Sequence, residues 1–302
     1  DYPAFDTIVG KLRQETEDST VPHFISNKSV FKGGGPAYLG PSAIPFVFDS
    51  SPHLPDYEVR DVQVSEEIRP RIGDRRYLLQ QFDRMRRDID ADGSILAMDE
   101  YQTRAVDLLS SSATAHAFDL SREKDSTRQQ YGHHRMGQSA LLARRLVEAG
   151  CSMVSLDFGK ATNAVPTWDD HGDAQHIFNS MKVRLPMYDQ ALSALITDLY
   201  DRGLDQRVLI IACGEFGRTP KVNMGRAAVP IAPGRDHWAD AMSILVSGGG
   251  MQMGQIIGST NARGEHPVDR PLDPNDFLAS VYRFLGIDPS QNLHDRRGRP
   301  IP

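Results

Sequence analysis

The segment RVLIIACGEFGRTP, residues 207–220, contains a continuous apolar run that is followed directly by charged residues. An apolar run of this kind is typical of a central strand that is buried on both faces of a parallel sheet. The run ends at Gly214, and Glu215 and Arg218 come soon after it. Because ligands bind at the carboxyl ends of the strands in open α/β sheets, the segment predicts both a sheet and the edge where a site lies.

Strands and helices alternate around this segment. Further strands are predicted at residues 151–158, CSMVSLDF, and at residues 242–246, in the run AMSILVSGGG. Between residues 158 and 207, apolar residues recur at spacings of four and three, which marks the buried stripe of one long helix. The stripe consists of Met181, Leu185, Tyr188, Leu192, Leu195 and Leu199. Pro186 is expected to begin a new helical segment or to kink this helix.

Capping residues, prolines and glycines predict the last helix and the N-terminal part of the chain. The segment LDPNDFLASVYRFLG has Asp273 as its N-cap, Pro274 at the first helical position and Gly286 just beyond its end. In residues 1–65, where Pro and Gly are frequent, only short strands such as VPHFIS and IPFVFD are predicted. The glycine triplet at residues 33–35 permits close backbone approach to an anion, although such runs more often form flexible surface loops.

Residues 72–150 are predicted to form a helical subregion. Three amphipathic patterns follow one another there, DRRYLLQQFDRMRRDID, MDEYQTRAVDLLSS and GQSALLARRLVEAG, and Gly150 suits the position just after a helix. The alternation of strands and helices elsewhere indicates an α/β fold. We therefore expect one domain over residues 1–302, with a mostly parallel sheet that is flanked by helices and carries a helical insertion.

A possible calcium site lies within the helical subregion. The segment DIDADGSILAMDE, residues 88–100, is similar to an EF-hand loop, with Gly93 at the sharp turn. The candidate ligands are Asp88, Asp90, Asp92 and Asp99. The twelfth loop position, where an EF-hand usually has a bidentate Glu, is an Asp here. A plain solvated turn, in which Asp and Gly serve as cap and left-handed residues, is the alternative.

Composition excludes several classes of protein. The formal net charge is −6, so no basic field points to nucleic acid. The two cysteines lie in apolar runs and do not indicate a disulfide framework. No apolar run approaches the roughly 20 residues that a membrane span needs. The chain is therefore expected to bind no nucleic acid and to have no membrane span.

Carboxylates and imidazoles occur in three loops that adjoin predicted strands. The loop after residues 151–158 contains WDDHGD, Glu215 follows the next strand, and GRDHW, residues 234–238, precedes the third. Zinc binds His nitrogen and carboxylate oxygen, whereas calcium takes oxygen alone. The loops together predict a divalent-metal site for zinc or calcium. Arg218 and Arg235 are the candidate groups for binding an oxyanion, and each residue taken alone is more typical of a polar surface loop.

Several motifs resemble a large bacterial family of sulfatase-like proteins of uncharacterised function, domain-of-unknown-function family 1501. They are WDDHGD, GEFGRTPKVN, GRDHW and GSTNARGEHPVDRPLDPNDFLASVYRFLGID, with GPAYLGPSAIPFV and YGHHRMGQSALLARRLVEAG upstream. The resemblance covers nearly the whole chain in collinear order. It implies the fold of the alkaline phosphatase and sulfatase superfamily, whose members use metal ions to hydrolyse or transfer phosphate and sulfate esters. It also implies a periplasmic or otherwise exported location.

Carried over by position, the resemblance implies a specific ligand set. The expected metal ligands are Asp169, His171, Glu215, Asp236 and His237. The sequence departs from the superfamily in two ways. The Asp-His pair usual after the central strand is Glu-Phe at residues 215–216. The opening strand, which ends in a metal-binding Asp before the nucleophile, has no counterpart before residue 21. We therefore expect a fragment or a processed form, and the sequence assigns no nucleophile.

These observations lead to one main hypothesis and two alternatives. The main hypothesis is a metal-dependent hydrolase of sulfate or phosphate esters, small or polymer-borne, in which Arg218 or Arg235 steadies the oxyanion and Trp238 packs its loop. The first alternative, motivated by the two departures, is a non-catalytic binding or assembly protein on the same scaffold. A transferase with the same metal chemistry is the second. The sequence leaves the oligomeric state open.

Overall fold

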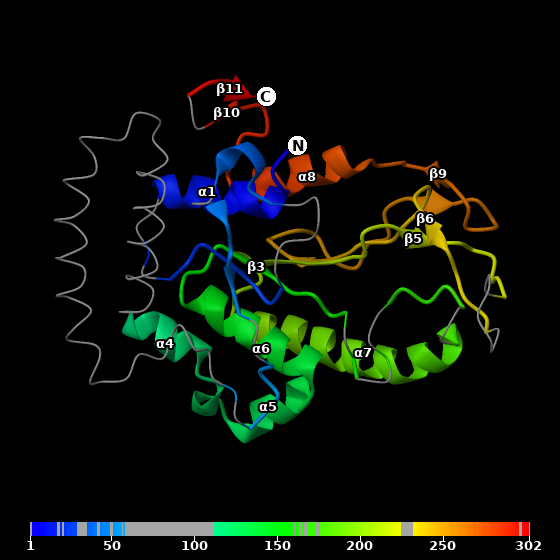
Figure 1. The fold of residues 1–302 in the computed structure, drawn as a ribbon, viewed down its shortest axis with the longest axis horizontal. Helices are drawn as coiled ribbons and strands as arrows, with labels where there is room; N and C mark the ends of the chain where they lie inside the picture. Colours follow the sequence, from blue (N-terminus) through cyan, green and yellow to red (C-terminus); the bar gives the residue numbers. More distant parts are fainter. Residues whose placement is uncertain are drawn as a thin grey trace. The chain divides into compact units, whose positions relative to one another are not determined.

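The structure, a computed structural model, is described for most of the chain (Figure 1). The described residues are 2–16, 19, 21–28, 35–40, 43–48, 51–55, 57, 111–159, 161–162, 165, 168–172, 176–224, 232–295 and 298–301. The calcium candidates Asp88, Asp90, Asp92 and Asp99 and the two predicted helices before residue 111 lie outside them. The chain divides into two compact units. Unit 1 comprises residues 1–127, 139–157 and 290–302, and unit 2 comprises residues 128–138 and 158–289.

Unit 1 contains a three-stranded parallel sheet with strand order β2-β1-β3. Its strands are β1 (Phe24–Ser26), β2 (Phe46–Val47) and β3 (Met153–Ser155). Ile25 pairs with Phe46 on one side and with Val154 on the other. All three residues of β1 are buried, as expected for the middle strand of a parallel sheet. The three strands predicted in this part of the sequence are therefore confirmed, with shorter bounds.

Helix α1, Phe5–Thr16, packs against β1 and β3 in a region where the sequence analysis predicts only short strands. Glycine in a helix interior costs about 1 kcal/mol relative to alanine, so Gly10 weakens the helical signal. A Cβ at Gly10 would lie only 2.8 Å from the Cβ of Phe24. The glycine therefore permits the close approach of α1 to β1, and this packing outweighs the local preference.

The described part of the predicted helical subregion, from residue 112 onward, consists mainly of helices. Its elements are α4 (Ser112–Phe118), the 3-10 helix η3 (Leu120–Arg122), α5 (Asp125–Tyr131) and α6 (Arg135–Glu148). Gly150 lies just beyond α6 with a φ of 103°, a conformation that favours glycine. Phe118 packs edge-on against Phe46 and Phe48 in unit 1, with ring centroids 5.8 and 5.9 Å apart.

Three smaller elements complete unit 1: η1 (Ala37–Leu39), β10 (Leu293–His294) and β11 (Pro300–Ile301). The strands β10 and β11 pair antiparallel. Cys151 in this unit and Cys213 in unit 2 are both free, in agreement with the predicted lack of a disulfide framework.

In unit 2 the described strands form antiparallel pairs, so the predicted mostly parallel sheet is corrected there. The pairs are β4 (Leu209–Ala212) with β7 (Leu245–Gly248), β5 (Gly217–Arg218) with β6 (His237–Trp238), and β8 (Ser259–Thr260) with β9 (Pro267–Asp269). All four residues of β4 are half-buried. A continuous apolar run signals burial on both faces, but it carries no information on the direction of the neighbouring strand.

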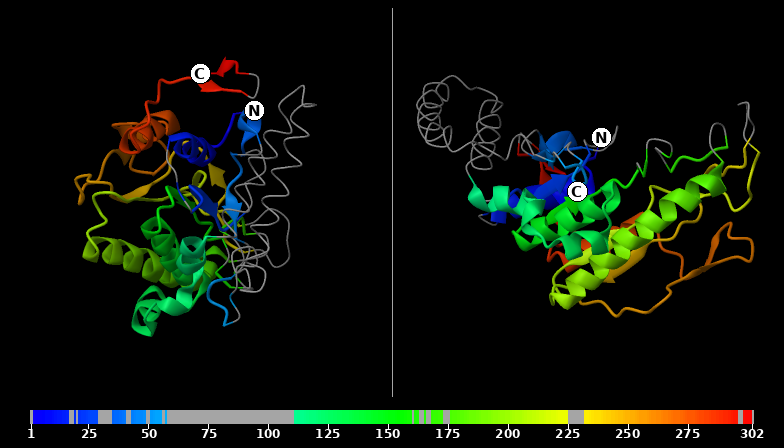
Figure 2. Two further views of the ribbon diagram at one scale, coloured as in Figure 1. Left: turned by 90° about the vertical axis from the view of Figure 1, so that its left-hand side faces the viewer. Right: turned by 90° about the horizontal axis from the view of Figure 1, so that it is seen from below.

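Helix α7, Ile177–Asp201, continues across Pro186 without a break (Figure 2). Its buried face differs from the predicted stripe, because Leu185 is 44% exposed whereas the neighbouring Arg184 is fully buried. The buried residues of the helix are Ile177, Ser180, Arg184, Ala191, Leu192, Ala194 and Leu199. An arginine at a buried position needs a partner carboxylate, which Asp170 provides at 2.8 Å.

Helix α8, Pro274–Phe284, begins and ends at the residues that the sequence predicts. The side chain of Asp273 accepts hydrogen bonds from the main-chain nitrogens of Asn275 and Asp276, and the carboxylate of Asp276 accepts one in return. Gly286 follows the helix with a φ of 69°. In the part of the chain that the structure describes, no helix is both long and apolar enough to cross a bilayer.

A charged cluster in unit 1 links α6 to the segment before α5. Glu123 forms ion pairs with Arg144, at 2.9 Å, and with Arg145, and the side chain of Arg144 is almost fully buried. Desolvation raises the pKa of Glu123, but the hydrogen bonds and charges of the two arginines outweigh it and hold that pKa below the ordinary 4.5. Ionisation of Glu123 therefore stabilises the fold at pH values above the ordinary pKa of 4.5. This contribution is lost as the pH falls through the lower pKa of the folded state.

We expect the variant Glu123→Gln to be less stable than the wild type by about 2 kcal/mol at pH 7, because hydrogen bonds to a charged group are lost. The difference should shrink as the pH falls below 4.5, where the wild-type carboxyl group also becomes neutral. Urea unfolding of both proteins at several pH values measures it. A difference that is the same at every pH would contradict the role of this carboxylate.

Candidate metal centre

Side chains of unit 2 come together from three separate segments of the chain. Asp169 and His171 lie in the loop before α7, Arg218 lies on β5, and His237 lies on β6. The pairing of β5 with β6 sets Arg218 directly opposite His237. Both side chains then reach Asp169, whose Oδ1 lies 2.7 Å from Arg218 Nη2 and 2.9 Å from His237 Nε2.

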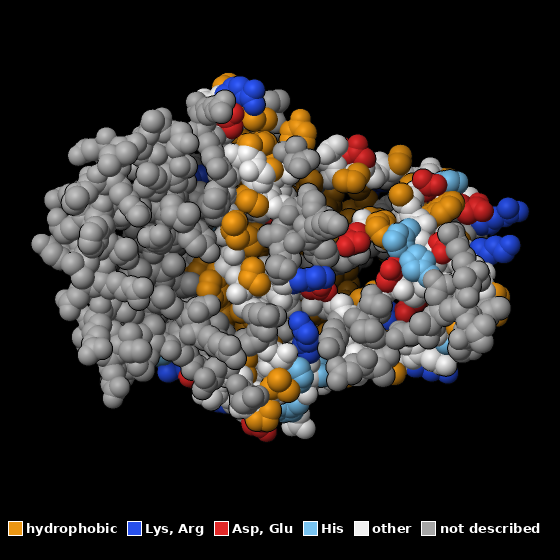
Figure 3. All heavy atoms as spheres, viewed as in Figure 1, with side chains coloured by type: hydrophobic (Ala, Val, Ile, Leu, Met, Phe, Trp, Pro, Cys, Tyr) orange, Lys and Arg blue, Asp and Glu red, His pale blue; other side chains and the backbone are white. Residues whose placement is uncertain are grey.

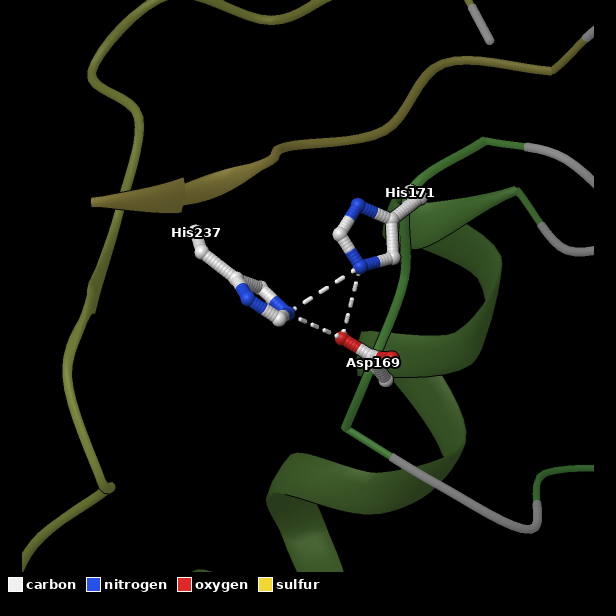
Figure 4. Close-up of side chains that lie close together, drawn as sticks. All are labelled: Asp169, His171 and His237. Atoms are coloured by element: carbon white, nitrogen blue, oxygen red, sulfur yellow. Dashed lines mark hydrogen bonds and ion pairs between the residues drawn. The ribbon is translucent and has the colours of Figure 1, made fainter. Parts of the chain in front are cut away.

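One atom from each of Asp169, His171 and His237 forms a compact triangle (Figure 4). His171 Nε2 lies 2.8 Å from Asp169 Oδ1, and the Nε2 atoms of the two histidines are 3.2 Å apart. The two imidazole rings face each other at a tilt, with centroids 4.7 Å apart. The three ligand-type atoms all lie within 4.8 Å of one another, so that one metal ion could contact all three.

Asp236 lies behind His171 and not at the triangle. Its Oδ1 is 3.0 Å from His171 Nδ1, and its Oδ2 accepts a hydrogen bond from Asn223 Nδ2 at 2.7 Å. A carboxylate on the second nitrogen of a metal-binding histidine fixes the tautomer and the orientation of the ring. The structure thus places Asp236, which the sequence analysis lists as a ligand, where it positions His171.

In the triangle, the lone pairs of His171 Nε2 and Asp169 Oδ1 face each other and repel, unless a proton or a cation lies between them. When His171 donates its Nδ1 proton to Asp236, its Nε2 carries a lone pair that faces Asp169 Oδ1 at 2.8 Å. His237 can donate its own Nε2 proton to Asp169, but the contact between His171 and Asp169 is not relieved by that bond. An additional proton or a cation relieves it.

Asp169 is ionised throughout the physiological pH range. Desolvation raises the pKa of its carboxyl group, but the hydrogen bonds from His237 and Arg218 and the charges of His171 and Arg218 outweigh it and lower the pKa to about 2. Metal ligands must be deprotonated to bind. This carboxylate therefore meets that condition without any change of pH.

Main-chain contacts hold the two ligand-bearing loops against each other. The nitrogen of Arg235 donates to the carbonyl oxygen of Asp170 at 2.9 Å. Gly234 packs on the backbone of the other loop, since a Cβ there would lie 2.1 Å from the carbonyl carbon of His171. Only glycine permits this approach, which sets the distance between His171 and His237.

A buried ion pair fixes the Asp169–His171 loop to helix α7. Asp170 is buried, and its Oδ2 accepts a hydrogen bond from Arg184 Nη1 at 2.8 Å. The guanidinium of Arg184 also lies over the ring of Trp168, with Cζ 4.5 Å from the ring centroid. The second carboxylate of WDDHGD is therefore engaged in the interior and does not face the triangle.

The two arginines that were expected to bind an oxyanion differ in their surroundings. Arg235 Nη1 donates to the carbonyl oxygens of Thr219 and Pro220, at 2.6 and 2.5 Å, and so ties its loop to the segment after β5. Arg218 lies at Asp169 itself, and its Nη1 also donates to the carbonyl oxygen of Arg235 at 3.2 Å. Of the two, Arg218 is the one beside the triangle.

The residues directly after strand β4, Glu215 and Phe216, contribute no ligand to the triangle. Glu215 is exposed and does not belong to the three-residue group. The ring of Phe216 packs on that of His237, with centroids 4.2 Å apart. Trp238 packs its loop as expected, since its Nε1 donates to the carbonyl oxygen of Glu265 at 2.7 Å.

The candidate site is open to solvent. Histidine and acidic side chains gather on the surface next to β5 and β6 (Figure 3). The side chains of Asp169 and His237 are each 51% exposed, and that of His171 is 28% exposed. A ligand can therefore approach the triangle directly from the solvent.

The motifs that form this site also fix the family of the chain. A family model described as a protein of unknown function (DUF1501) matches residues 2–302. The chain belongs to the DUF1501 family. No curated protein and no solved structure matches it. The family that the motifs indicate is thus confirmed, whereas the relation to the sulfatase superfamily, the activity and the exported location stay predictions.

Two residues that build the site of this DUF1501 chain are not singled out by its sequence. Arg184 lies beside the predicted stripe of a helix, and Asn223 is the last residue of the motif GEFGRTPKVN, where it carries no predicted role. The two adjacent carboxylates of WDDHGD offer the one available signal, because neighbouring side chains in a loop point in different directions and only one can face a given site. The sequence does not say which positively charged side chain binds the second carboxylate, that of Asp170.

We expect Asp236→Ala to weaken zinc binding by about 10- to 100-fold, since a carboxylate that holds a metal-binding histidine through its other nitrogen typically contributes that much. The matched control is Asp240→Ala, in the same loop but on an exposed side chain that lies 3.7 Å from His266. Isothermal titration of the metal-free proteins with zinc gives both affinities. Equal weakening in the two variants, or none in Asp236→Ala, would exclude the positioning role of Asp236.

A second variant tests the main-chain contact. Gly234→Ala places a Cβ 2.1 Å from main-chain atoms that cannot rotate away, so we expect a loss of about 3 kcal/mol in the free energy of unfolding, together with weaker zinc binding. In the control Gly214→Ala, the new Cβ meets no atom closer than 3.2 Å. Thermal unfolding of both variants is the measurement, and equal melting temperatures would refute the close-approach explanation.

Proposed function

We propose that this DUF1501 chain binds one divalent cation, zinc, at Asp169, His171 and His237, and that it hydrolyses sulfate or phosphate esters with it. The observation that carries the proposal is the triangle of one carboxylate oxygen and two imidazole nitrogens. The resemblance to sulfatase-like proteins supplies the substrate class. The proposal includes the exported location that the resemblance implies.

The edges of the triangle fit a metal-binding polyhedron. With metal–ligand bonds of about 2.0–2.1 Å, neighbouring ligand atoms lie about 3.3 Å apart in a tetrahedral site and about 2.9 Å apart in an octahedral one. The observed separations are 2.8, 2.9 and 3.2 Å. Two imidazoles favour zinc over calcium, which prefers oxygen ligands alone.

The number of ligands favours a catalytic over a structural role for the cation. Catalytic zinc sites have three protein ligands and leave one position for water or substrate, whereas structural sites are closed by four. Asp169, His171 and His237 would hold the zinc ion, which would supply a water of lowered pKa and polarisation of the ester oxygen. In this proposal, the role of Asp236 is to hold His171 in the orientation and tautomer that binding needs.

Arg218 provides the second positive group for an anionic ester. It lies next to Asp169 and is 27% exposed, so its guanidinium can be reached by an oxyanion at the triangle. Guanidinium groups match the oxygens of phosphate and sulfate in a planar, bidentate way. We propose that Arg218 binds and orients the ester, whereas Arg235 keeps the loop in place.

Zinc binding and turnover together test the proposal. The metal-free chain should bind one equivalent of zinc by isothermal titration, and Asp169→Ala, His171→Ala and His237→Ala should each abolish it. The control His266→Ala removes an exposed histidine of the same unit that lies outside the group. The zinc-loaded chain should hydrolyse an aryl sulfate or an aryl phosphate, and Arg218→Gln should raise KM more than it lowers kcat.

Three results would overturn it in different ways. If the wild type binds no zinc, the proposed site is wrong. If zinc binds but neither ester is hydrolysed, the chain is better described as a non-catalytic binding protein on the same scaffold. If His266→Ala loses zinc as the ligand variants do, the binding belongs to other residues.

A further inference from the structure

We infer that Arg184 is a positioning residue of the cation site, which keeps the Asp169–His171 loop in its ligating geometry. The inference rests on the proposed cation site. Arg184 lies in the interior of unit 2, outside the triangle, and no feature of the sequence marks it. Its role follows from what it binds: the one residue that separates the two ligand-type residues of the loop.

The contact between Arg184 and Asp170 fixes the direction of the loop. Arg184 is fully buried and Asp170 is 3% exposed. The guanidinium approaches both carboxylate oxygens, Oδ2 at 2.8 Å and Oδ1 at 3.4 Å. A two-point contact between planar groups defines an orientation as well as a distance. Because Asp170 points inward to Arg184, its neighbours Asp169 and His171 are turned toward the surface.

An aromatic clamp fixes the start of the same loop. Trp168 contacts two residues of α7: the guanidinium of Arg184 lies over its ring, 4.5 Å from the centroid, and the ring of Tyr188 is edge-on with centroids 5.8 Å apart. Its Nε1 donates to the carbonyl oxygen of Phe158 at 2.9 Å. Trp168 immediately precedes Asp169, so the contacts of Trp168 and the ion pair of Asp170 lie on either side of the carboxylate that contacts His171, His237 and Arg218.

The residue that pairs with Arg184, Asp170, also contacts the loop that carries His237. The carbonyl oxygen of Asp170 accepts a hydrogen bond from the nitrogen of Arg235, two residues before His237. Asp170 therefore connects helix α7, through its side chain, to the loop that carries His237, through its main chain. If Arg184 is removed, Asp170 is no longer held in place, and the positions of all three ligand atoms become less well fixed.

Stability alone is a poor explanation for this arginine. A buried ion pair often contributes no more stability than well-packed apolar residues of similar volume. An apolar side chain at position 184 would continue the apolar face of α7 at lower desolvation cost, yet Leu185 is exposed and Arg184 is inside. What the ion pair adds, and an apolar side chain cannot, is a fixed orientation for the loop.

The experiment compares two buried arginines in the full chain. Arg184→Met is expected to raise the dissociation constant for zinc about 10-fold or more, because the competent loop geometry is less populated. The matched control is Arg144→Met: the side chain of Arg144 is 2% exposed and paired with Glu123 and Glu148, but it lies in unit 1. This control should lower the melting temperature and leave the zinc affinity unchanged.

A readout without zinc separates this inference from the proposed function. His171 is 28% exposed and bonded to Asp236, so diethylpyrocarbonate should modify it slowly in the metal-free wild type. In Arg184→Met the modification of His171, followed by mass spectrometry, should be faster, and in Arg144→Met it should not. If the wild type binds no zinc, the proposed function fails by that result, while the modification rates still test the role of Arg184.

Arg184→Lys keeps the experiment decisive if Arg184→Met does not fold. Lysine retains the charge but not the planar fork, so it should preserve the fold, weaken zinc binding and speed the modification of His171. The inference is overturned if either folded Arg184 variant binds zinc as the wild type does with an unchanged modification rate. It is also overturned if Arg144→Met weakens zinc binding to the same extent as Arg184→Met.

Discussion

The two ligand-bearing loops of unit 2 are joined main chain to main chain, and the candidate site depends on this contact. Three hydrogen bonds form it: Arg235 N to Asp170 O at 2.9 Å, Ala232 N to Gly172 O at 3.2 Å, and Ile177 N to Pro233 O at 3.0 Å. Main-chain hydrogen bonds form whatever side chains lie beside them, but the close approach of residue 234 to the backbone of His171 requires a glycine. Two imidazoles that are 66 residues apart in sequence are thereby brought within 3.2 Å of each other.

The charges at this point favour a cation and an anion together. Arg218 lies at Asp169, and a cation at the triangle would lie near the same carboxylate. Two unit charges about 4 Å apart repel by about 1 kcal/mol in water, and a dication and a guanidinium by about twice that. The carboxylate of Asp169, which contacts Arg218, would offset this repulsion, so the guanidinium does not exclude a cation. With the proposed cation bound, two adjacent positive groups, one of them planar, would make a favourable place for an oxyanion. In the proposed function, the arrangement is therefore better suited to an anionic ester than to a neutral ligand.

Local chemistry predicted some elements from sequence, and non-local packing decided the rest. The cap at Asp273 depends on residues within one turn of helix α8, so the sequence suffices to predict it. The antiparallel pairing of β4 and the helix around Gly10 depend on distant partners, which an apolar run does not identify. At the site, the sequence indicated the ligand-type residues but not which of them face the triangle and which lie behind it. Asp236 was predicted as a ligand, but it binds the far nitrogen of His171 and does not reach the triangle. Asp170, the second carboxylate of WDDHGD, binds the buried Arg184 instead.

Exposure of the ligand atoms also limits how a substrate is held. A hollow of about 450 Å³ lies between α7 and β7, but its lining is largely apolar, with Tyr200 and Met253 among its side chains, and it includes the acidic Asp201. It offers an anionic ester no positive partner. In the proposed function, affinity for the ester at the triangle would come from charge at an open surface, where salt screens it and where the rest of the substrate remains in solvent. Such a site suits an ester group that protrudes from a larger molecule as well as a small ester, because neither needs to be enclosed.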